Sequence, residues 1–466
     1  MNTMHASKVK LIYTDWYINS FYNERKAFGN AMHPRIREYI QYIYKNKLKI
    51  DYYNILQYEH NQQKAIKFDH ADLKRFFDKN FPQNVISSNL IQDDDYLYIY
   101  PLEIKDSLPS LYRENSFILE DEKYSWYLKD MIPTDIIEHM RTGKVKILVS
   151  LIHDPLYDEN SIMMFEQEMN GLGIDGSNII ILGGSKFDEY YEKHPTSKVK
   201  IYNGHLFLKN YVDMIKEFPT TGDLGYICEI VEEKDLDENK LRPYKFLCNN
   251  KTMRKPHRAS MGYFAIKYDL LKEGKFSFIE NASFAELKNQ IRQIIMNAND
   301  EYIQKLVSII PYELDTQFLK PEQKGHFGAK NNMKEWYSDT YINLVTETFF
   351  GRNVFLSEKI FKPLSNLQPF IVLGDYGTLA ELKRLGFKTF EPFIDESYDL
   401  EMERYKRIEK IEIEIEKLKN KSIEEIHNWY YSIKDILIHN QKHLYSFENY
   451  ECFEEIFEKI NLDYKN

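Results

Sequence analysis

A short segment in the second half of the chain places charged side chains at the start of a predicted helix. Ser357 stands where its hydroxyl oxygen can cap this helix by accepting from a free backbone N–H. Glu358 and Lys362 are four residues apart and share a face, and Lys359 lies in the same first turns. A lysine there opposes the helix dipole, whereas a bound phosphate would suit both the dipole and the free N–H groups. The segment is typical either of an anion site or of an exposed ion pair contributing a few tenths of a kcal/mol.

A second basic cluster follows the predicted strand at residues 244–250, which ends in Asn249 and Asn250. Arg254, His257 and Arg258 are spaced i, i+3, i+4, so they can converge on one side of a helix that begins there. Forked guanidinium groups at a strand-to-helix turn suit a pyrophosphate. A solvated basic turn is the alternative. Because both basic clusters follow strands of one predicted sheet, we expect them to form an anion site together.

Glu347 ends another predicted buried strand, at residues 341–347. A carboxylate at this position can accept hydrogen bonds from ribose hydroxyls or from a base. It can equally pair with a nearby arginine or lysine, and the sequence leaves both open.

His153 and Asp154 follow the predicted strand at residues 144–151 in the first half of the chain. Transfer of a sugar to a hydroxyl with inversion needs a general base within hydrogen-bond reach of that hydroxyl, and either residue type can serve. The alternative is a turn closed by Asp154 and Pro155.

Two series of alternating strands and helices must position these side chains. Continuous apolar runs predict buried strands at 144–151, 178–184 and 198–207, and, in a second series, at 244–250, 276–279, 341–347, 369–374 and 388–390. Helices are predicted between them, among others at 256–271, 357–367 and 377–386. Such repetition predicts parallel sheets that bind ligands beyond the carboxyl ends of their strands.

The charged, proline-ended stretch at 232–243 is the predicted linker between the two series. The sequence therefore predicts an α/β protein with two Rossmann-like domains facing an interdomain cleft. We expect an N-terminal acceptor-side domain at 1–240, with its Rossmann-like core at about 90–240, a donor domain at 241–400 and C-terminal helices at 401–466. Isoleucines 408, 411, 413 and 415 indicate a long helix that covers the protein's own body, with a partner-binding coiled coil as the alternative.

Composition excludes several classes of protein. With 466 residues, 43% of them hydrophobic, the chain can bury two cores, and its net charge of −10 disfavours nucleic acid as an obligatory partner. The three cysteines are not spaced as a metal-binding pair, and no apolar run approaches the roughly 20 residues of a spanning helix. The N-terminus lacks a signal-peptide pattern. These features predict a cytoplasmic protein without a membrane span, and they leave its oligomeric state open.

The two basic blocks resemble the donor domain of α-1,3-fucosyltransferases, and more broadly glycosyltransferases of the two-Rossmann-domain GT-B type, including phage and bacterial members. The resemblance covers residues 244–399 and rests on the strand with its Asn and Arg and on the Ser-Glu-Lys that precedes a buried strand ending in glycine. It implies that a nucleoside-diphosphate sugar is held by Asn249, Arg258, Glu358 and Lys359, with Glu347 and Lys362 nearby. The chain departs from the fucosyltransferase pattern at Glu347-Thr348-Phe349, so neither fucose nor GDP follows from it.

We therefore predict a metal-independent glycosyltransferase that needs no obligatory cofactor and takes a UDP- or GDP-sugar as its donor. The acceptor, a glycan, a lipid-linked group or a nucleic acid, is open. Two alternatives remain: a phage-type glycosyltransferase that modifies DNA, and a non-catalytic interaction protein that retains the fold. The residues predicted to bind the donor are Asn249, Arg254, Arg258, Glu347, Ser357, Glu358, Lys359 and Lys362, and the predicted catalytic residues are His153 and Asp154.

Overall fold

The chain divides into two compact units, Met1–Leu206 with Asn449–Asn466, and Phe207–Glu448. The computed structural model describes, apart from isolated short pieces, residues 9–12, 85–86, 97–104, 114–119, 122–127, 134–151, 159–183, 190–203, 230–312, 334–351 and 354–447. Each unit is described by itself below. No helix in these described ranges is both long and apolar enough to cross a membrane.

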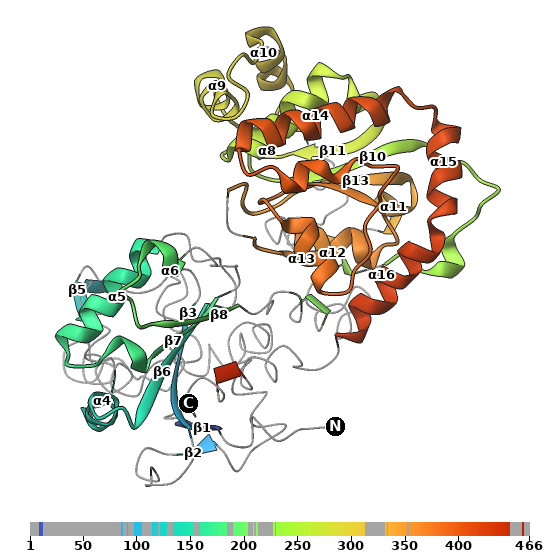
Figure 1. Cartoon of the computed structure of the whole chain (residues 1–466). Coiled ribbons are helices and arrows are strands. Elements are labelled where there is room, and N and C mark those ends of the chain that lie inside the picture. Colours follow the sequence, from blue (N-terminus) through green and yellow to red (C-terminus); the bar gives the residue numbers. More distant parts are fainter. Residues whose placement is uncertain are drawn as a thin grey trace. The chain divides into compact units, whose positions relative to one another are not determined.

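The first unit is built on a six-stranded parallel sheet (Figure 1). The strands lie in the order β2 (Val85–Ile86), β1 (Val9–Ile12), β3 (Leu97–Ile104), β6 (Val145–Leu151), β7 (Ile179–Gly183) and β8 (Lys200–Asn203). Helices α4 (Thr134–Arg141), α5 (Glu159–Gly171) and α6 (Tyr190–Lys193) connect or precede the later strands. Every residue of β7 is buried, as expected for a central strand covered on both faces. A separate antiparallel hairpin pairs β4 (Glu114–Leu119) with β5 (Glu122–Tyr127).

The second unit contains a four-stranded parallel sheet in the order β11 (Gly274–Phe278), β10 (Tyr244–Asn250), β13 (Thr340–Thr346) and β14 (Phe370–Leu373). Its helices are α8 (Pro256–Lys267), α9 (Phe284–Arg292), α10 (Asp300–Ile309), α11 (Lys334–Ser338), α12 (Glu358–Ser365) and α13 (Thr378–Arg384). Strand β13 is buried throughout, so the apolar run that predicted it packs on both faces.

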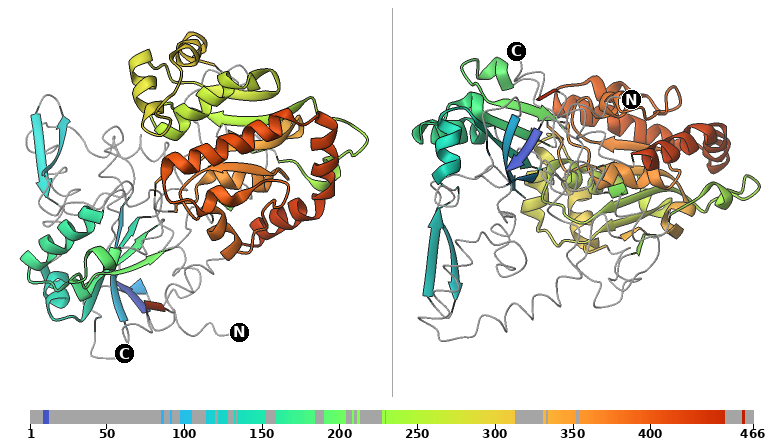
Figure 2. Two further views of the ribbon diagram at one scale, coloured as in Figure 1. Left: turned by 45° about the horizontal axis from the view of Figure 1, so that its top comes forward. Right: turned by 90° about the horizontal axis from the view of Figure 1, so that it is seen from below.

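The order of these strands creates a topological switch point between β10 and β13. From β10 the chain crosses through α8 to β11 on one side, and from β13 it crosses through α12 to β14 on the other. Right-handed crossovers in opposite directions place α8 and α12 on opposite faces of the sheet, and helices lie on both sides of it (Figure 2). The first turns of both helices therefore meet at the carboxyl ends of β10 and β13, where open α/β sheets bind ligands.

Three helices follow the second sheet: α14 (Arg404–Asn420), α15 (Ile423–Ser432) and α16 (Lys434–Ser446). Ile408, Ile411 and Ile415 of α14 are buried in the core of the second unit, whereas Ile413 is 58% exposed. The stripe therefore covers the protein's own body, as the sequence predicted. The predicted long helix over these isoleucines is α14, and a second helix starts after it because Ser422 caps that helix by accepting from the backbone N–H of Glu425.

The predicted fold class is confirmed, since both units are Rossmann-like α/β sheets and the second ends in helices. Strand β10 has the predicted bounds. The strand predicted at 388–390 does not form; this stretch is held by Asn440, whose side chain bonds the backbone N–H and carbonyl of Lys388. The stretch predicted as a linker, residues 232–243, lies inside the second unit, and its Arg242 is buried.

Candidate functional site

A hollow of about 620 Å³ opens at the switch point of the second sheet. Six cationic and two carboxylate side chains line it: Lys251, Arg254, Lys255, Arg258, Lys359 and Lys362, with Glu280 and Glu358. Asn249, Asn250 and Thr348 at the ends of β10 and β13 complete much of the remaining wall. An excess of positive charge in a chain whose net charge is −10 indicates a site for an anion.

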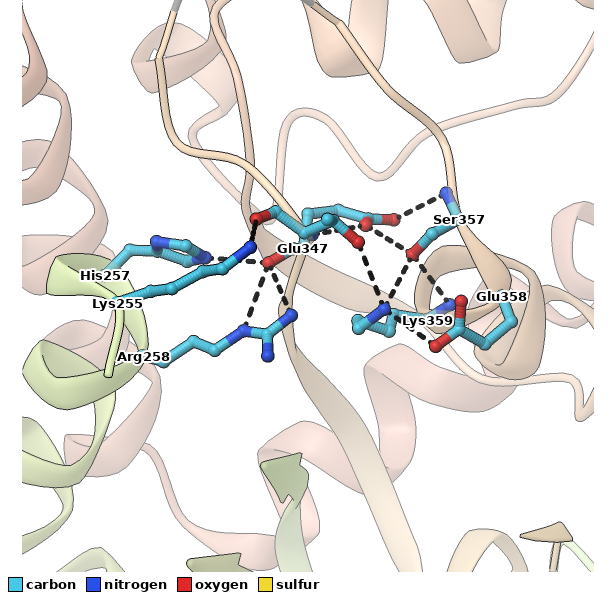
Figure 3. A network of polar contacts seen from close by, with 8 residues as sticks. Lys255, His257, Arg258, Glu347, Ser357, Glu358 and Lys359 are labelled. Carbon is cyan, nitrogen blue, oxygen red and sulfur yellow. Dashed lines mark hydrogen bonds and ion pairs between the residues drawn. The ribbon is translucent and has the colours of Figure 1, made fainter. Parts of the chain in front are cut away.

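Glu347, directly after β13, organises one side of this site (Figure 3). Its carboxylate accepts hydrogen bonds from the backbone N–H of Ser357 at 3.1 Å, the Ser357 hydroxyl at 2.5 Å and the backbone N–H of Thr348 at 2.8 Å. Burial raises the pKa of Glu347, and Lys359 and the hydrogen bonds oppose that rise. The anion that meets the start of α12 is therefore the protein's own Glu347 carboxylate. Glu347 does not line the hollow, and it acts as a positioning residue for the start of α12.

Ser357 caps α12 as predicted, because its hydroxyl oxygen accepts from the backbone N–H of Lys359 at 3.3 Å. The first amides of α12 are thus bonded within the protein, and side-chain cations are left to meet an anion. The ammonium group of Lys359 is oriented by Thr348 Oγ1, Ser357 Oγ and Glu358 Oε1, the last at 2.7 Å.

Glu358 is held as a buried carboxylate by its two basic neighbours. Burial favours its neutral form, but the charges of Lys359 and Lys362 outweigh that effect, and the pKa of Glu358 falls below its ordinary value. Lys362, one turn further along α12, lines the same hollow, as the predicted shared face requires.

The opposite side of the site comes from the start of α8. His257 bonds the backbone carbonyl of Glu347 at 2.7 Å, and Arg258 donates to the same oxygen from Nε and Nη2. Burial and the nearby Arg258 charge lower the pKa of His257 well below its ordinary value, so the ring is neutral at pH 7. Lys255 donates to the carbonyl of Thr348 at 2.8 Å. These contacts tie the start of α8 to the end of β13 across the switch point.

Arg254 departs from the predicted convergence with His257 and Arg258. The helix begins only at Pro256, so Arg254 precedes it and does not share its face. Its side chain is 79% exposed and forms an ion pair with Glu280 at 3.5 Å. Both arginines nevertheless line the hollow.

The structure thus brings six of the predicted donor-site residues into one hollow, with Ser357 and Glu347 behind them. The six are Asn249, Arg254, Arg258, Glu358, Lys359 and Lys362. His153 and Asp154 lie outside the described residues, so their role stays a prediction.

Sequence reasoning missed the other residues that line the hollow, among them Lys255, Glu280 and Thr348. A signal existed for Glu280: it stands two residues beyond β11, at the carboxyl edge where ligand-facing side chains gather. The sequence gives no such signal for Thr348, because its place in the site depends on how close its hydroxyl lies to the ammonium group of Lys359 in the folded chain. Within the described part of the chain, no three His, Cys, Asp or Glu side chains gather as metal ligands would.

No protein-family model and no curated protein matches this sequence. The chain is similar to a solved structure of OtsA in its apo form, with 10% identical residues and a TM-score of 0.34 over 78% of this chain and 93% of that one. A similarity of this size establishes neither a shared fold nor a shared activity. The residues of the site are therefore the basis on which a function is assigned.

Proposed function

We propose that the protein is a GT-B-type glycosyltransferase that moves a sugar from a nucleoside-diphosphate sugar to an acceptor hydroxyl without needing a metal ion. The observation that carries the proposal is the cation-lined hollow at the switch point of the second sheet. Parallel α/β sheets bind nucleotides at this place. The resemblance of residues 244–399 to fucosyltransferase donor domains points to the same ligand class.

In this mechanism the diphosphate is the leaving group. Negative charge grows on it as the bond to the sugar breaks, and fixed cations stabilise that charge most effectively where water is excluded. Arg258 and Lys359 are fixed in advance, by the Glu347 carbonyl and by the Glu358 carboxylate respectively. Lys362 adds a third cation from the same face of α12. Side-chain cations therefore do the work that the helix amides, already bonded to Glu347 and Ser357, cannot.

The acceptor hydroxyl must lose its proton as it attacks. His153 or Asp154 is our candidate general base, on the grounds of its place after a strand of the first sheet. The donor is a UDP- or GDP-sugar.

Thermal unfolding in the presence of nucleotides tests the proposal. A ligand at one hundred times its Kd stabilises the folded state by about 2.7 kcal/mol, which raises the unfolding midpoint by about 5–10 °C for a domain of this size. We expect UDP or GDP to produce such a shift in the wild-type chain. Arg258→Ala should abolish it.

Lys305→Ala is the matched control, because Lys305 is an exposed lysine on α10 away from the hollow. This variant should keep the full nucleotide shift. If no UDP, GDP, CDP or TDP compound stabilises the wild-type protein, the proposed function is wrong. If Arg258→Ala keeps the shift, the nucleotide binds elsewhere.

A further inference from the structure

Three buried hydrogen-bond acceptors in the hollow lack a donor among the residues that the structure describes. They are the side-chain oxygens Asn249 Oδ1, Asn250 Oδ1 and Glu280 Oε2. A buried acceptor without a donor costs about 1–3 kcal/mol. Three at one place therefore indicate a ligand that supplies donors.

Asn250 is fixed with its oxygen unused. The residue is 1% exposed, and its amide nitrogen donates to the carbonyl of Arg258 at 3.1 Å. The amide nitrogen of Asn250 is therefore occupied in holding the start of α8. The oxygen, on the other branch of the same side chain, is left for a donor.

Glu280 lies beside the two asparagines because strands β10 and β11 run in register. Asn250 pairs with Phe278, and the backbone N–H groups of Ile279 and Glu280 both donate to the carbonyl of Lys251. The only charged partner the structure gives Glu280 within the described residues is Arg254, whose Nε lies 3.5 Å from Oε2 without forming a hydrogen bond.

The hollow therefore has two chemically different parts. Arg258, Lys359 and Lys362 supply positive charge and donors from the α8 and α12 sides. The carboxyl ends of β10 and β11 supply the three acceptors without a described donor, and one of these belongs to a carboxylate that would repel a phosphate. A ligand that fits both parts carries an anion at one end and neutral hydroxyl donors at the other.

We propose that Glu280, together with Asn249 and Asn250, binds the ribose hydroxyls of the nucleotide donor. This inference rests on the proposed function and names the part of the donor that these residues select. A vicinal diol offers two O–H donors, and a carboxylate with adjacent amide oxygens accepts both. In nucleotide-binding α/β sheets, an acidic residue at the end of the second strand does the same for a ribose. Here Glu280 follows the second strand of this sheet in chain order.

The test compares ligands that differ only in these hydroxyls. The Kd of UDP, GDP, their 2′,3′-dideoxy counterparts and inorganic pyrophosphate is measured by calorimetry for the full-length wild-type chain and for Glu280→Gln. A hydrogen bond to a charged group corresponds to a tenfold or larger change in Kd. We expect the wild type to bind the ribonucleotide at least tenfold more tightly than the dideoxynucleotide. In Glu280→Gln that preference should fall to about threefold or less, while pyrophosphate binding should not weaken.

Glu409→Gln, an exposed carboxylate variant on α14, is the matched control and should keep the wild-type preference. An equal ribose preference in Glu280→Gln and wild type would overturn the inference while leaving the proposed function intact. Equal binding of the ribonucleotide and the dideoxynucleotide by the wild type would overturn it too. A Glu280→Gln variant that changes only the preference between UDP and GDP would also overturn it, because that result would place the base at Glu280. If neither nucleotides nor pyrophosphate bind the wild type, the proposed function itself fails.

Discussion

Replacing Glu347 by glutamine removes the buried acceptor that joins the end of β13 to the start of α12. The carboxylate accepts three hydrogen bonds, two from Ser357 and one from the backbone N–H of Thr348. Glutamine has nearly the same shape, but one of its two terminal atoms is an NH₂ group that cannot accept. The variant therefore tests the hydrogen bonds and the charge without opening a cavity.

The magnitude depends on which donors lose their partner. One carboxylate oxygen serves the backbone N–H of Ser357, and the other serves the Ser357 hydroxyl and Thr348. Whichever oxygen becomes nitrogen, the backbone N–H of buried Ser357 or of part-buried Thr348 is left without an acceptor, at about 1–3 kcal/mol. Lys359 also loses a buried opposite charge that lies close to it. We expect Glu347→Gln to lower the free energy of unfolding by about 2–4 kcal/mol.

The assay is thermal unfolding of wild type, Glu347→Gln, Ser357→Ala and the double variant. A loss of this size lowers the midpoint by about 5–15 °C in a domain of this size. Because Glu347 and Ser357 share a hydrogen bond, the two losses should overlap, with a coupling energy of about 1 kcal/mol. Exposed Glu409→Gln should stay within about 0.5 kcal/mol of wild type.

Two results would refute this reasoning. A midpoint for Glu347→Gln within 1–2 °C of wild type, as an order of magnitude, would mean that the carboxylate does not hold α12. If the losses of unfolding free energy in the two single variants simply add up in the double variant, Glu347 and Ser357 stabilise the fold independently, and their hydrogen bond contributes nothing measurable.

Two further predictions concern charge. Lys362→Ala should weaken nucleotide binding about tenfold and make it depend less on salt in calorimetric titrations. Because Lys362 is one of the two charges that keep the buried Glu358 ionised, the variant should also lower the unfolding midpoint measured without ligand. Unchanged nucleotide binding and salt dependence would remove Lys362 from the site. Burial raises the pKa of Asp375 to about 7. Between about pH 4 and 7 the folded chain therefore binds more protons at this carboxyl than the unfolded chain does. Through this group the free energy of unfolding falls as pH rises, by up to about 1 kcal/mol per pH unit. Asp375→Asn keeps an oxygen for the Gly351 N–H and should lose that pH dependence in unfolding midpoints measured from pH 5 to 8; an identical slope in both proteins would contradict it.

The strands of the fold could be predicted because parallel strands buried on both faces are continuous apolar runs. Strand β10 shows this best, since the charged stretch before it and the basic turn after it mark both ends. The C-terminal helices show the limit of periodicity. Their apolar stripe continues past Lys421, and only the Ser422 and Glu425 capping pair marks the break. The strand predicted at 388–390 does not form, because the side chain of Asn440, 52 residues away, already bonds the backbone N–H and carbonyl of Lys388 that a neighbouring strand would pair with.

The candidate site was predictable where it depends on local spacing. Ser357 as a cap and Glu358 with Lys362 on one face follow from the helix alone. The direction of the Glu347 side chain does not, because it depends on how closely residue 357 returns to the end of β13. Local sequence offered ribose, base and basic partners for Glu347. The structure gives its carboxylate three donors, a serine hydroxyl and two backbone amides, with the charge of Lys359 close by.

The most direct test of the account is the release of nucleoside diphosphate from a panel of UDP-, GDP-, CDP- and TDP-sugars, measured by chromatography after incubation with the full-length chain. We predict that at least one donor yields free nucleoside diphosphate, and that Arg258→Ala abolishes this release while Lys305→Ala does not. No release from any donor, together with no stabilisation by any of the four nucleoside diphosphates, would contradict the central claim that this hollow is a sugar-nucleotide site.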